Sequence, residues 1–564
     1  MRDYPAIAAD YCSAVLAGKI PAGRLLKLAC KRQVDDLRRW SKEGSPFHFD
    51  KGAASRVCKF IELLTHVKGE LAGTRIRLEP WQVFILTTAF GWLDADGNRR
   101  FRRVYIEVAR GNGKSALSSG VGLYCLCADK EPGAEVYSFA TTRDQAKIVW
   151  GDAKAMTQAN ADLRKAFGLQ VLANALYLPS SNSTFQAKSA EGSTLDGLNT
   201  HLAIIDELHA HKTRAVYDVV ETSLGKRRNS LLWCITTAGF DLSGICYEVR
   251  GMVSAVLEGT AQDERQFGVI FTIDEGDDWR TDEALMKANP NWGVSVRPEV
   301  VKGLQAKAML MAAAENNFKT KHLDVWCNAN AAWMSMDKWD ACADQGLSPD
   351  DFEGCPCWIG LDLANKRDLA AKVLVFAKTI DGKQHFAVFG DYYLPKKTVE
   401  ESSNSQYSGW ERDGLITATE GVVTDFNRIA DDIRRDCARF DVREVRYDPW
   451  QANQLATTLA EEGVPMVEVR QTVQNLSDPM KQLEAYVFDK RLHHDGNACL
   501  RWQVSNVVAH VDAKDNIYPR KERPENKIDG VVATIIALSG AVLCAEAPAA
   551  FEEFLDNPLV FTYG

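Results

Sequence analysis

The stretch Val104–Ser115 reads V-Y-I-E-V-A-R-G-N-G-K-S and decides the fold of the first half of the chain. Its first five residues form an alternating apolar run typical of a strand, a Gly-Asn-Gly turn follows, and the residues after Ser115 favour a helix. This order of strand, glycine loop, lysine, serine and helix is that of a phosphate-binding P-loop, whose backbone N–H groups surround phosphate oxygens. In such a loop Lys114 reaches the β- and γ-phosphates of ATP, and Ser115 binds Mg²⁺.

One position departs from the P-loop pattern G-x-x-x-x-G-K-[ST], because Val108 stands where the pattern has its first glycine. The alternative interpretation is a simple glycine turn between a strand and a helix. Within a P-loop, the guanidinium of Arg110 is a candidate to stabilise the charge that develops on the γ-phosphate. The predicted ATP-binding residues of the loop are Arg110, Gly111, Asn112, Gly113, Lys114 and Ser115.

A downstream pair of carboxylates supplies the second half of an ATP-hydrolysing site. The apolar run Leu202–Ile205 is typical of a strand buried on both faces of a parallel sheet, and Asp206 and Glu207 follow it. Adjacent carboxylates at the end of a buried strand are unfavourable without a cation. In a P-loop enzyme the aspartate binds Mg²⁺ and the glutamate polarises the attacking water. The alternative is a strand that ends in a solvated acidic turn.

A third buried strand, Leu231–Ile235, is followed by the hydroxyl side chains of Thr236 and Thr237. Hydroxyls beside the nucleotide can sense the γ-phosphate; alternatively, they are turn residues. Nearly continuous apolar strands alternate with helices from about residue 76 to residue 275, which predicts an α/β domain with a mostly parallel sheet.

The length of 564 residues indicates more than one domain. We expect an N-terminal helical region over residues 1–70, a P-loop ATPase domain over 71–330, a linker over 331–351, a second α/β domain over 352–545 and a poorly ordered tail over 546–564. A long helical stretch is expected from Val300 to about Asn328.

The cysteine content indicates a protein that acts in a reducing compartment. Fourteen cysteines without a C-x-x-C pair indicate free thiols, and no signal peptide is recognisable. The apolar run Val531–Cys544 is short for a membrane span. A net charge of −9 argues against a general nucleic-acid coat, so DNA-binding cations must be concentrated locally. Candidate clusters, each equally well interpreted as a solvated face, lie at 99–103, 226–228 and 520–527.

The second domain carries three spaced aspartates at the ends of predicted elements. The strand Cys357–Leu361 leads into Asp362, and a later strand leads into Asp448, where Pro449 stops it. Asp529 precedes an apolar helix. Three such carboxylates match the needs of an RNase H-like nuclease, in which two Mg²⁺ or Mn²⁺ ions hold the attacking and leaving oxygens of a phosphodiester.

Each of these aspartates also has a structural interpretation. Asp362 can be a strand-end residue, Asp448 part of a turn with Pro449, and Asp529 a helix cap. Asp368, six residues beyond Asp362, is a candidate fourth ligand or a nearby supporting acid.

With both sets of motifs taken together, the chain resembles the large terminase subunit of tailed bacteriophages over roughly residues 45–545. The resemblance includes Arg110 in the variant P-loop, and Lys521 resembles a family lysine near the scissile phosphate. The ATPase stretches that carry it are Leu78–Gln82, Ala140–Ala146, Leu195–Asn199, Ile204–Ala210 and Thr236–Gly239. The nuclease stretches are Ile359–Ala364, Arg446–Trp450 and Lys527–Ala533.

The resemblance implies a motor that uses ATP and Mg²⁺ to drive double-stranded DNA into a procapsid, and a nuclease that cuts concatemeric DNA. It implies that Gln82 binds the adenine side of ATP and that Thr236 and Thr237 couple hydrolysis to movement. It further implies a small terminase subunit, a portal protein and a homo-oligomeric ring as partners, without a membrane. The expected location is the host cytoplasm, docked transiently on the procapsid and absent from the mature virion.

Two other functions remain open from the residues. One is a helicase-like ATPase whose second domain binds DNA without cutting it, and the other is a non-enzymatic portal- or DNA-binding scaffold. Intact Lys114, Ser115, Asp206 and Glu207 argue against the scaffold. We expect the 14 tryptophans to pack in cores and at strand ends rather than to stack on bases, and we assign no role to His209.

Overall fold

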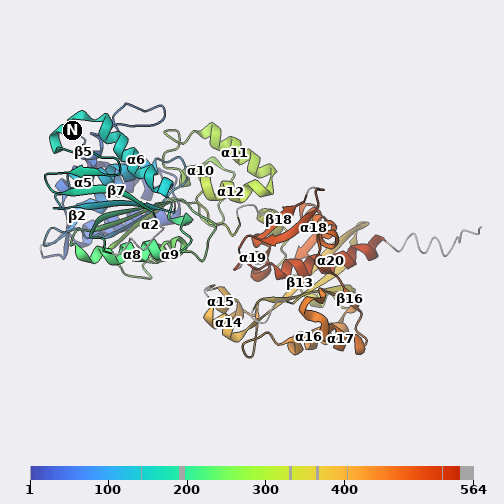
Figure 1. The fold of residues 1–564 in the computed structure, drawn as a ribbon. Coiled ribbons are helices and arrows are strands. Elements are labelled where there is room, and N and C mark those ends of the chain that lie inside the picture. Colours follow the sequence, from blue (N-terminus) through green and yellow to red (C-terminus); the bar gives the residue numbers. More distant parts are fainter. Residues whose placement is uncertain are drawn as a thin grey trace, which may run out of the picture. The chain divides into compact units, whose positions relative to one another are not determined.

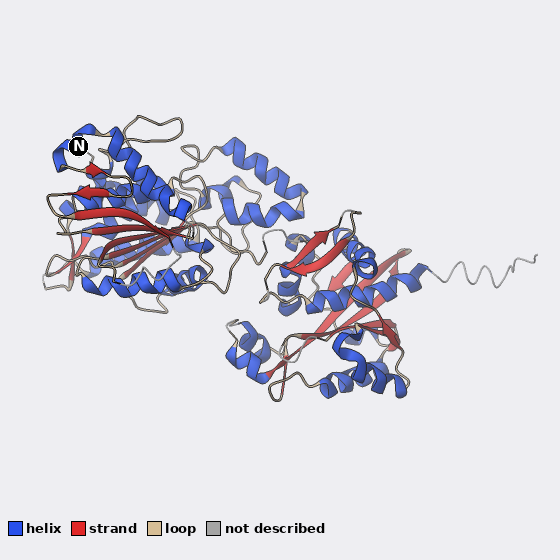
Figure 2. Cartoon of the chain, viewed as in Figure 1, coloured by secondary structure: helices blue, strands red, loops and turns tan. Residues whose placement is uncertain are grey.

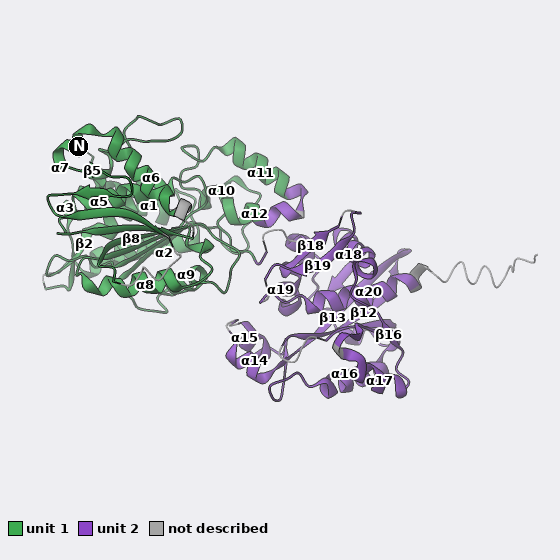
Figure 3. Cartoon of the chain, viewed as in Figure 1, with its two compact units in different colours: residues 1–308, 317–327 green, residues 309–316, 328–564 purple. Residues whose placement is uncertain are grey.

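The computed structural model describes residues 2–42, 44–141, 143–189, 197–329, 333–363, 368–402, 404, 406–512, 514–523 and 525–546. The chain forms two compact units, residues 1–308 with 317–327 and residues 309–316 with 328–564 (Figure 3). Most of the predicted tail, the start of the Leu195–Asn199 stretch and residues 330–332 of the predicted junction lie outside the described residues.

The first unit is built on a mostly parallel eight-stranded sheet of order β10-β3-β9-β8-β4-β7-β6-β5. The parallel strands run from β10 to β7, and β6 and β5 continue the sheet antiparallel. The strands are β3 (Arg103–Glu107), β4 (Glu135–Ala140), β5 (Gln170–Val171), β6 (Leu176–Leu178), β7 (Ser183–Ser189), β8 (Thr200–Asp206), β9 (Leu231–Thr236) and β10 (Gln266–Ile270). The predicted α/β class with a parallel sheet is confirmed for this unit.

Helices lie on both faces of this sheet (Figures 1 and 2). The helices up to the last strand of this sheet are α1 (Tyr4–Leu16), α2 (Arg24–Arg39), α3 (Lys51–Ile61), α4 (Pro80–Gly91), α5 (Lys114–Cys127), α6 (Arg143–Ala159), α7 (Ala161–Phe167), α8 (Ala215–Ser223) and α9 (Ile245–Glu258). Three later helices, α10 (Asp282–Ala288), α11 (Pro298–Leu310) and α12 (Ala312–His322), contribute to a separate small core. Two short 3₁₀ helices, η1 (Leu208–Ala210) and η2 (Leu224–Lys226), follow β8 and α8. The predicted long stretch from residue 300 is thus two helices, interrupted at Met311.

Residues 1–70 were expected to form a separate helical region, but they share the core of the first unit. Three helices do form there, together with strand β1 (Phe47–Phe49), which pairs with β2 (Trp92–Asp94). The Tyr11 ring lies 5.8 Å from Phe84 of α4, and the Trp92 indole donates to Gln33 at 2.8 Å. Each of these helices has an apolar face. Burial of that face against α4, rather than packing of the three helices on one another alone, stabilises them.

The second unit contains a mixed sheet of order β14-β13-β12-β11-β15-β16, with β17 beside β13. Strands β11, β12 and β13 form an antiparallel meander, and β15 and β16 add in parallel beyond β11, as in RNase H-like nucleases. The strands are β11 (Pro356–Asp362), β12 (Ala370–Ile380), β13 (Lys383–Pro395), β14 (Thr417–Thr419), β15 (Asp441–Tyr447), β16 (Met466–Glu468) and β17 (Leu492–His494). A separate hairpin pairs β18 (Val507–Val511) with β19 (Ile517–Lys521).

The apolar run at the end of this unit is a core helix. It forms α20 (Asp529–Glu546), which packs on β11 and β12. The other helices are α13 (Met336–Asp340), η3 (Pro349–Phe352), α14 (Lys396–Glu401), α15 (Gln406–Arg412), α16 (Phe426–Arg439), α17 (Pro449–Glu461), α18 (Val473–Phe488) and α19 (Ala498–Asn506). Among the described helices, none has the length and apolar character that a membrane span requires.

The segment 331–351, expected to be a linker, belongs to the second unit where it is described. Trp333, Met334 and Trp339 lie in that unit's hydrophobic core, and the Trp339 ring stacks on His494 with centroids 4.4 Å apart. The sequence did not predict that these aromatic residues join the core, because isolated aromatic residues give no periodic pattern.

Candidate functional site

The loop between β3 and α5 has the backbone of a P-loop. Gly111 and Gly113 have φ angles of 86° and 76°, a left-handed region that glycine enters without a steric cost. The N–H of Val108 donates to the carbonyl of Thr236 at 3.0 Å, so the loop begins bonded to β9. The buried Lys114 Nζ donates to the carbonyl oxygens of Val108 at 3.1 Å and Ala109 at 3.4 Å. The lysine thus lies across the loop, where phosphates would compete with the carbonyls for its charge.

Asn112 braces the loop against the end of α10, which sequence reasoning did not predict. Its buried amide donates to Asn289 at 3.0 Å, and its Oδ1 accepts from the backbone N–H of Asn291 at 3.0 Å. The hydroxyl of Ser295 donates to the Gly111 carbonyl at 2.6 Å. Because these bonds fix the loop before any ligand binds, the backbone N–H groups of the loop are already oriented for phosphate binding.

A cavity of about 460 Å³ lies beside the loop and contains Gln82, Gly113 and Asn291 in its wall. Gln82 Oε1 accepts the N–H of Glu79 at 3.0 Å, which caps α4 and directs the amide of Gln82 toward the cavity wall. This cavity is of the size expected for a small-molecule site. It is therefore the place where a nucleoside next to the P-loop would lie.

Asp206 and Glu207 occupy the end of β8, two strands from the P-loop in the order β3-β9-β8. Burial and the neighbouring Glu207 raise the pKa of Asp206 to about 7, against the opposing effect of Lys114. Burial also disfavours ionised Glu207, but His209, Lys114 and Arg110 outweigh it and lower its pKa to about 2. The two carboxylates therefore differ: one gains most from a cation, and the other stays ionised as a base requires.

His209 joins this carboxylate to the threonines of β9, and sequence reasoning assigned it no role. Its Nδ1 lies 3.2 Å from Glu207 Oε2, 3.0 Å from Thr236 Oγ1 and 3.4 Å from Thr237 Oγ1. Its backbone N–H also donates to Thr236 Oγ1 at 3.1 Å. Glu207 itself has a φ of 50°, rare for a residue with a side chain, which turns it back toward this cluster. The predicted threonines are thus in contact with the predicted base through one imidazole.

A buried carboxylate pair lies behind the same strand ends. Glu107, at the end of β3, is fully buried and pairs with Arg250 at 2.9 Å. Asp324 is also fully buried, has a φ of 57° and accepts the N–H of Ala238 at 2.7 Å, while its Oδ2 has no partner. Burial and Glu107 raise the pKa of Asp324 well above its usual range. This shift favours the protonated form of Asp324, which contacts the stretch Thr236–Gly239 through the N–H of Ala238.

In the second unit, Asp362 and Asp448 lie at the ends of neighbouring parallel strands. β11 and β15 pair Leu361 with Tyr447, so the next residue of each strand is an aspartate. Gln471 bridges them: its side chain donates to Asp362 Oδ1 at 2.8 Å, and its N–H donates to Asp448 Oδ2 at 3.0 Å. No local pattern in the sequence indicates this glutamine.

Asp529 and Asp368 complete the acidic cluster. Burial and Asp529 raise the pKa of Asp362 well above its usual range. Burial and Asp368 raise the pKa of Asp529 to about 6, although Lys521 and Lys527 act against this. Lys527 Nζ lies 2.5 Å from Asp368 Oδ1. The structure thus brings together the three predicted aspartates, the candidate fourth acid and the predicted lysine.

The donor set of this cluster fits divalent metal ions. All four acids offer hard oxygen atoms, and Asp529 Oδ2 is buried without a hydrogen-bond partner. A bound cation would relieve both that orphaned oxygen and the carboxylate repulsion. Within the described residues, no three of these acids place oxygens within 4.8 Å of one another.

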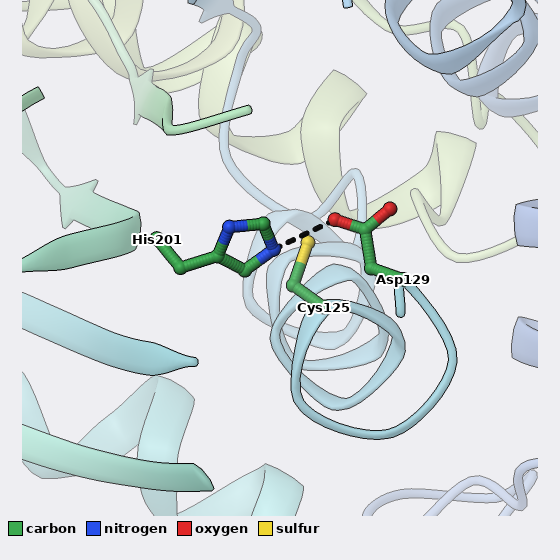
Figure 4. Close-up of side chains that lie close together, drawn as sticks. All are labelled: Cys125, Asp129 and His201. Atoms are coloured by element: carbon green, nitrogen blue, oxygen red, sulfur yellow. Dashed lines mark hydrogen bonds and ion pairs between the residues drawn. The ribbon is translucent and has the colours of Figure 1, made fainter. Parts of the chain in front are cut away.

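One further cluster, Cys125, Asp129 and His201, has ligand atoms close enough for a metal ion (Figure 4). Here His201 Nε2 lies 2.7 Å from Asp129 Oδ2, and Arg99 Nη1 lies 2.6 Å from the same oxygen. The guanidinium already supplies the cation, and burial raises the pKa of the Cys125 thiol well above its usual range. We therefore interpret the cluster as a buried ion pair. The described cysteines are free, as expected for a reducing compartment.

One chain thus contains a P-loop sheet and an RNase H-like sheet. This combination defines a class of proteins in which an ATPase is joined to a nuclease. Comparison with known proteins identifies the family. The model described as terminase large subunit, ATPase domain, matches residues 80–255. The model described as terminase large subunit, endonuclease domain, matches residues 260–545. The chain belongs to the terminase large subunit family, and it is the ATPase and endonuclease of a phage DNA-packaging motor.

The chain is also similar to individual proteins. Protein YmfN of Escherichia coli (strain K12) is 39% identical over 358 residues, which are 62% of this chain and 79% of that protein. The large terminase subunit of Enterobacteria phage HK97 is 28% identical over 519 residues, 89% of this chain and 99% of its own. The crystal structure of the HK97 large terminase shares 24% identity, covers 86% of this chain and 99% of its own, and has a TM-score of 0.43. The predicted family, fold class and pair of enzymatic activities are confirmed.

Proposed function

We propose that the two acidic sites divide the work of the motor between them. The site formed by Lys114, Asp206 and Glu207 hydrolyses ATP, and the site formed by Asp362, Asp448 and Asp529 cuts DNA. The observation that carries the proposal is the convergence of the three aspartates, which lie far apart in the sequence, with one buried oxygen of Asp529 left without a hydrogen-bond partner. An acidic cluster of this kind has no structural value of its own, because its charges repel one another.

In the ATPase site, the loop 110–115 binds the phosphates and Gln82 contacts the adenine side. Ser115 and Asp206 hold Mg²⁺, which neutralises phosphate charge when bound. Glu207 orients the attacking water and accepts its proton, a role supported by its pKa of about 2, which keeps the carboxylate ionised and able to accept a proton. Arg110 stabilises the γ-phosphate, supported by its electrostatic effect on Glu207. Thr236 and Thr237 pass the change at Glu207 to the rest of the unit through His209.

In the nuclease site, Asp362, Asp448 and Asp529 hold two divalent ions, with Asp368 as a supporting acid. Bound Mg²⁺ or Mn²⁺ would supply positive charge for the phosphodiester and lower the pKa of water. The chain's own residues do the positioning: Gln471 fixes the carboxylates of Asp362 and Asp448, and Lys521 faces the phosphate side. The proposed role of Lys521 is supported by its charge, which acts to lower the pKa of Asp529.

The assembly proposed around this chain follows from its family. Double-stranded DNA passes into a procapsid, and the chain forms a homo-oligomeric ring on the portal protein while a small terminase subunit selects the DNA. The complex works in the host cytoplasm and leaves the particle before the virion matures. Nothing in the two sites favours the alternatives, a helicase that does not cut or an inactive scaffold.

A crossed pair of variants tests the division of work. Lys114→Ala should remove ATP turnover and leave plasmid nicking in Mn²⁺ intact. Asp362→Asn should remove nicking and leave ATP turnover intact. If either variant loses both activities while far-UV dichroism shows a folded protein, the sites are not separate in the way proposed.

A further inference from the structure

Trp450 is the one tryptophan of this chain that is exposed to solvent. All 14 tryptophans lie in the described part of the chain. Of these 14 side chains, Trp450 is the one that is exposed, with 78% of its surface accessible to solvent. The others are buried or half-buried, as expected from the sequence. An exposed indole leaves a large apolar surface in water, so its position calls for a partner.

The position of Trp450 links it to the nuclease site. It is the second residue of α17, and its backbone N–H donates to Asp448 Oδ1 at 2.8 Å. The other oxygen of Asp448 accepts from Gln471 at 3.0 Å. The indole is therefore attached to the rim of the acidic cluster, within a side chain's length of a proposed metal-binding carboxylate.

The folding of α17 does not need this indole. The core-facing residues of the helix are Ala452, Leu455, Ala456 and Leu459, all buried. They lie two, five, six and nine positions beyond Trp450 and form one helical face. Trp450 projects from a different face of the helix. Its exposure therefore follows from its position on the helix and does not indicate a gap in the core.

The charges around the cluster make DNA the favoured partner. Lys521 and Lys527 lie close enough to Asp529 to act on its charge, and Lys527 Nζ lies 2.5 Å from Asp368 Oδ1. Phosphate is the ligand that such cations attract. A strand held by its phosphate among these lysines and metal ions must place its sugar and base near the rim. An aromatic ring beside a phosphate track stacks on any base, because each base has a π-face.

We propose that Trp450 is a DNA-contact residue that stacks on a base or sugar next to the scissile phosphate. The proposal rests on the nuclease site proposed above. The ring holds the strand in place for cutting and does not touch the reacting atoms. Since stacking is independent of base identity, the contact would suit an enzyme that cuts DNA of varied sequence.

The test measures DNA binding apart from cutting. In the full-length Asp362→Asn protein with Mn²⁺, we compare the Kd for a fluorescent 30-base-pair duplex with and without Trp450→Ala. Loss of one stacking contact should raise Kd roughly tenfold, while Trp450→Phe should stay within about threefold. The matched control is Phe488→Ala, an aromatic that is 46% exposed at the far end of α18, roughly 20 Å along the helix from its start beside Gln471. Its Kd should not change.

A second readout identifies stacking itself. Acrylamide should quench the emission of the wild-type protein more than that of Trp450→Phe, and DNA should remove the difference. An unchanged Kd in Trp450→Ala, or an equal loss in Phe488→Ala, overturns the proposal; so does a DNA-insensitive quenching difference, which would point to a protein partner. If instead Asp362→Asn still nicks plasmid, the nuclease assignment fails while the binding result for Trp450 stands by itself.

Discussion

Gly360 lies two residues before Asp362, at a place where the backbones of β11 and α20 approach each other closely. A Cβ at this position would lie 2.0 Å from the carbonyl oxygen of Ala533 and 2.9 Å from the backbone N of Ala537. Both are main-chain atoms of α20, the helix that begins at Asp529. We therefore predict that Gly360→Ala separates the strand that carries one aspartate from the helix that carries another.

The size of the effect follows from that distance. Ordinary contacts of a Cβ begin near 3.4 Å, so the helix must move by about 1.4 Å or the strand must bend. Inserting a methyl group into a packed core costs about 1–3 kcal/mol, and more where backbone cannot move aside. We expect a loss of about 3 kcal/mol in the stability of the second unit. Displacement of this order also disrupts the acidic cluster, because a 1 Å misplacement lowers catalysis about 10²-fold.

Calorimetry and plasmid nicking in Mn²⁺ measure the two consequences. The control is Gly409→Ala in α15, where a Cβ would meet nothing within 4 Å and φ is not positive. That variant should be stabilised by about 0.5–1 kcal/mol and should cut normally. ATP turnover should survive in both. A Gly360→Ala protein as stable and as active as Gly409→Ala would refute the close packing on which the reasoning rests.

Four further variants probe the ATPase unit. Glu207→Gln should bind Mg·ATP and lose about 10²–10⁴-fold in single-turnover hydrolysis, while Asp206→Asn should lose nucleotide affinity; wild-type turnover by Glu207→Gln would move the base elsewhere. Arg110→Lys keeps the charge but not the guanidinium fork, so kcat should fall about 10²-fold or more at unchanged affinity; weak binding with a normal saturated rate would make Arg110 structural. Because the pKa of Asp324 is raised in the fold, its proton is held to a higher pH there than in the unfolded state, where it is lost above about pH 4. Between these two pKa values unfolding releases a proton, so wild-type stability should fall as pH rises, by up to about 1.4 kcal/mol per pH unit. Asp324→Asn keeps the acceptor for Ala238 and should raise Tm more at pH 8 than at pH 5; parallel Tm curves would show that Asp324 is ionised in the fold.

The parts of the sites that lie at strand ends were predictable from the sequence. A buried strand is marked by continuous apolar residues, and its last residue is marked by a polar side chain, as at Asp206, Thr236 and Asp362. Parallel neighbours then bring such ends to one edge of the sheet, which explains why the residues predicted from strand ends lie close together in the structure.

Residues that act through tertiary contacts gave no such signal. His209 and Gln471 bridge elements whose proximity depends on the whole sheet, and neither stands in a distinctive pattern. Asp324 is marked only by a φ of 57°, which the sequence does not reveal. Domain limits were also hidden, since residues 260–327 include β10, an edge strand of the ATPase sheet, within the stretch that matches the endonuclease family model.

The most direct test of the two-site account is nicking of supercoiled plasmid in Mn²⁺ by Asp362→Asn, Asp448→Asn and Asp529→Asn, each in the full-length protein. If the three carboxylates act as one metal site, each single variant should lose nearly all cutting, and double variants should be hardly worse, because groups that act as a unit are non-additive. ATP turnover should persist in all of them. Robust cutting by any one variant removes that residue from the site, and robust cutting by Asp362→Asn contradicts the RNase H-like mechanism altogether.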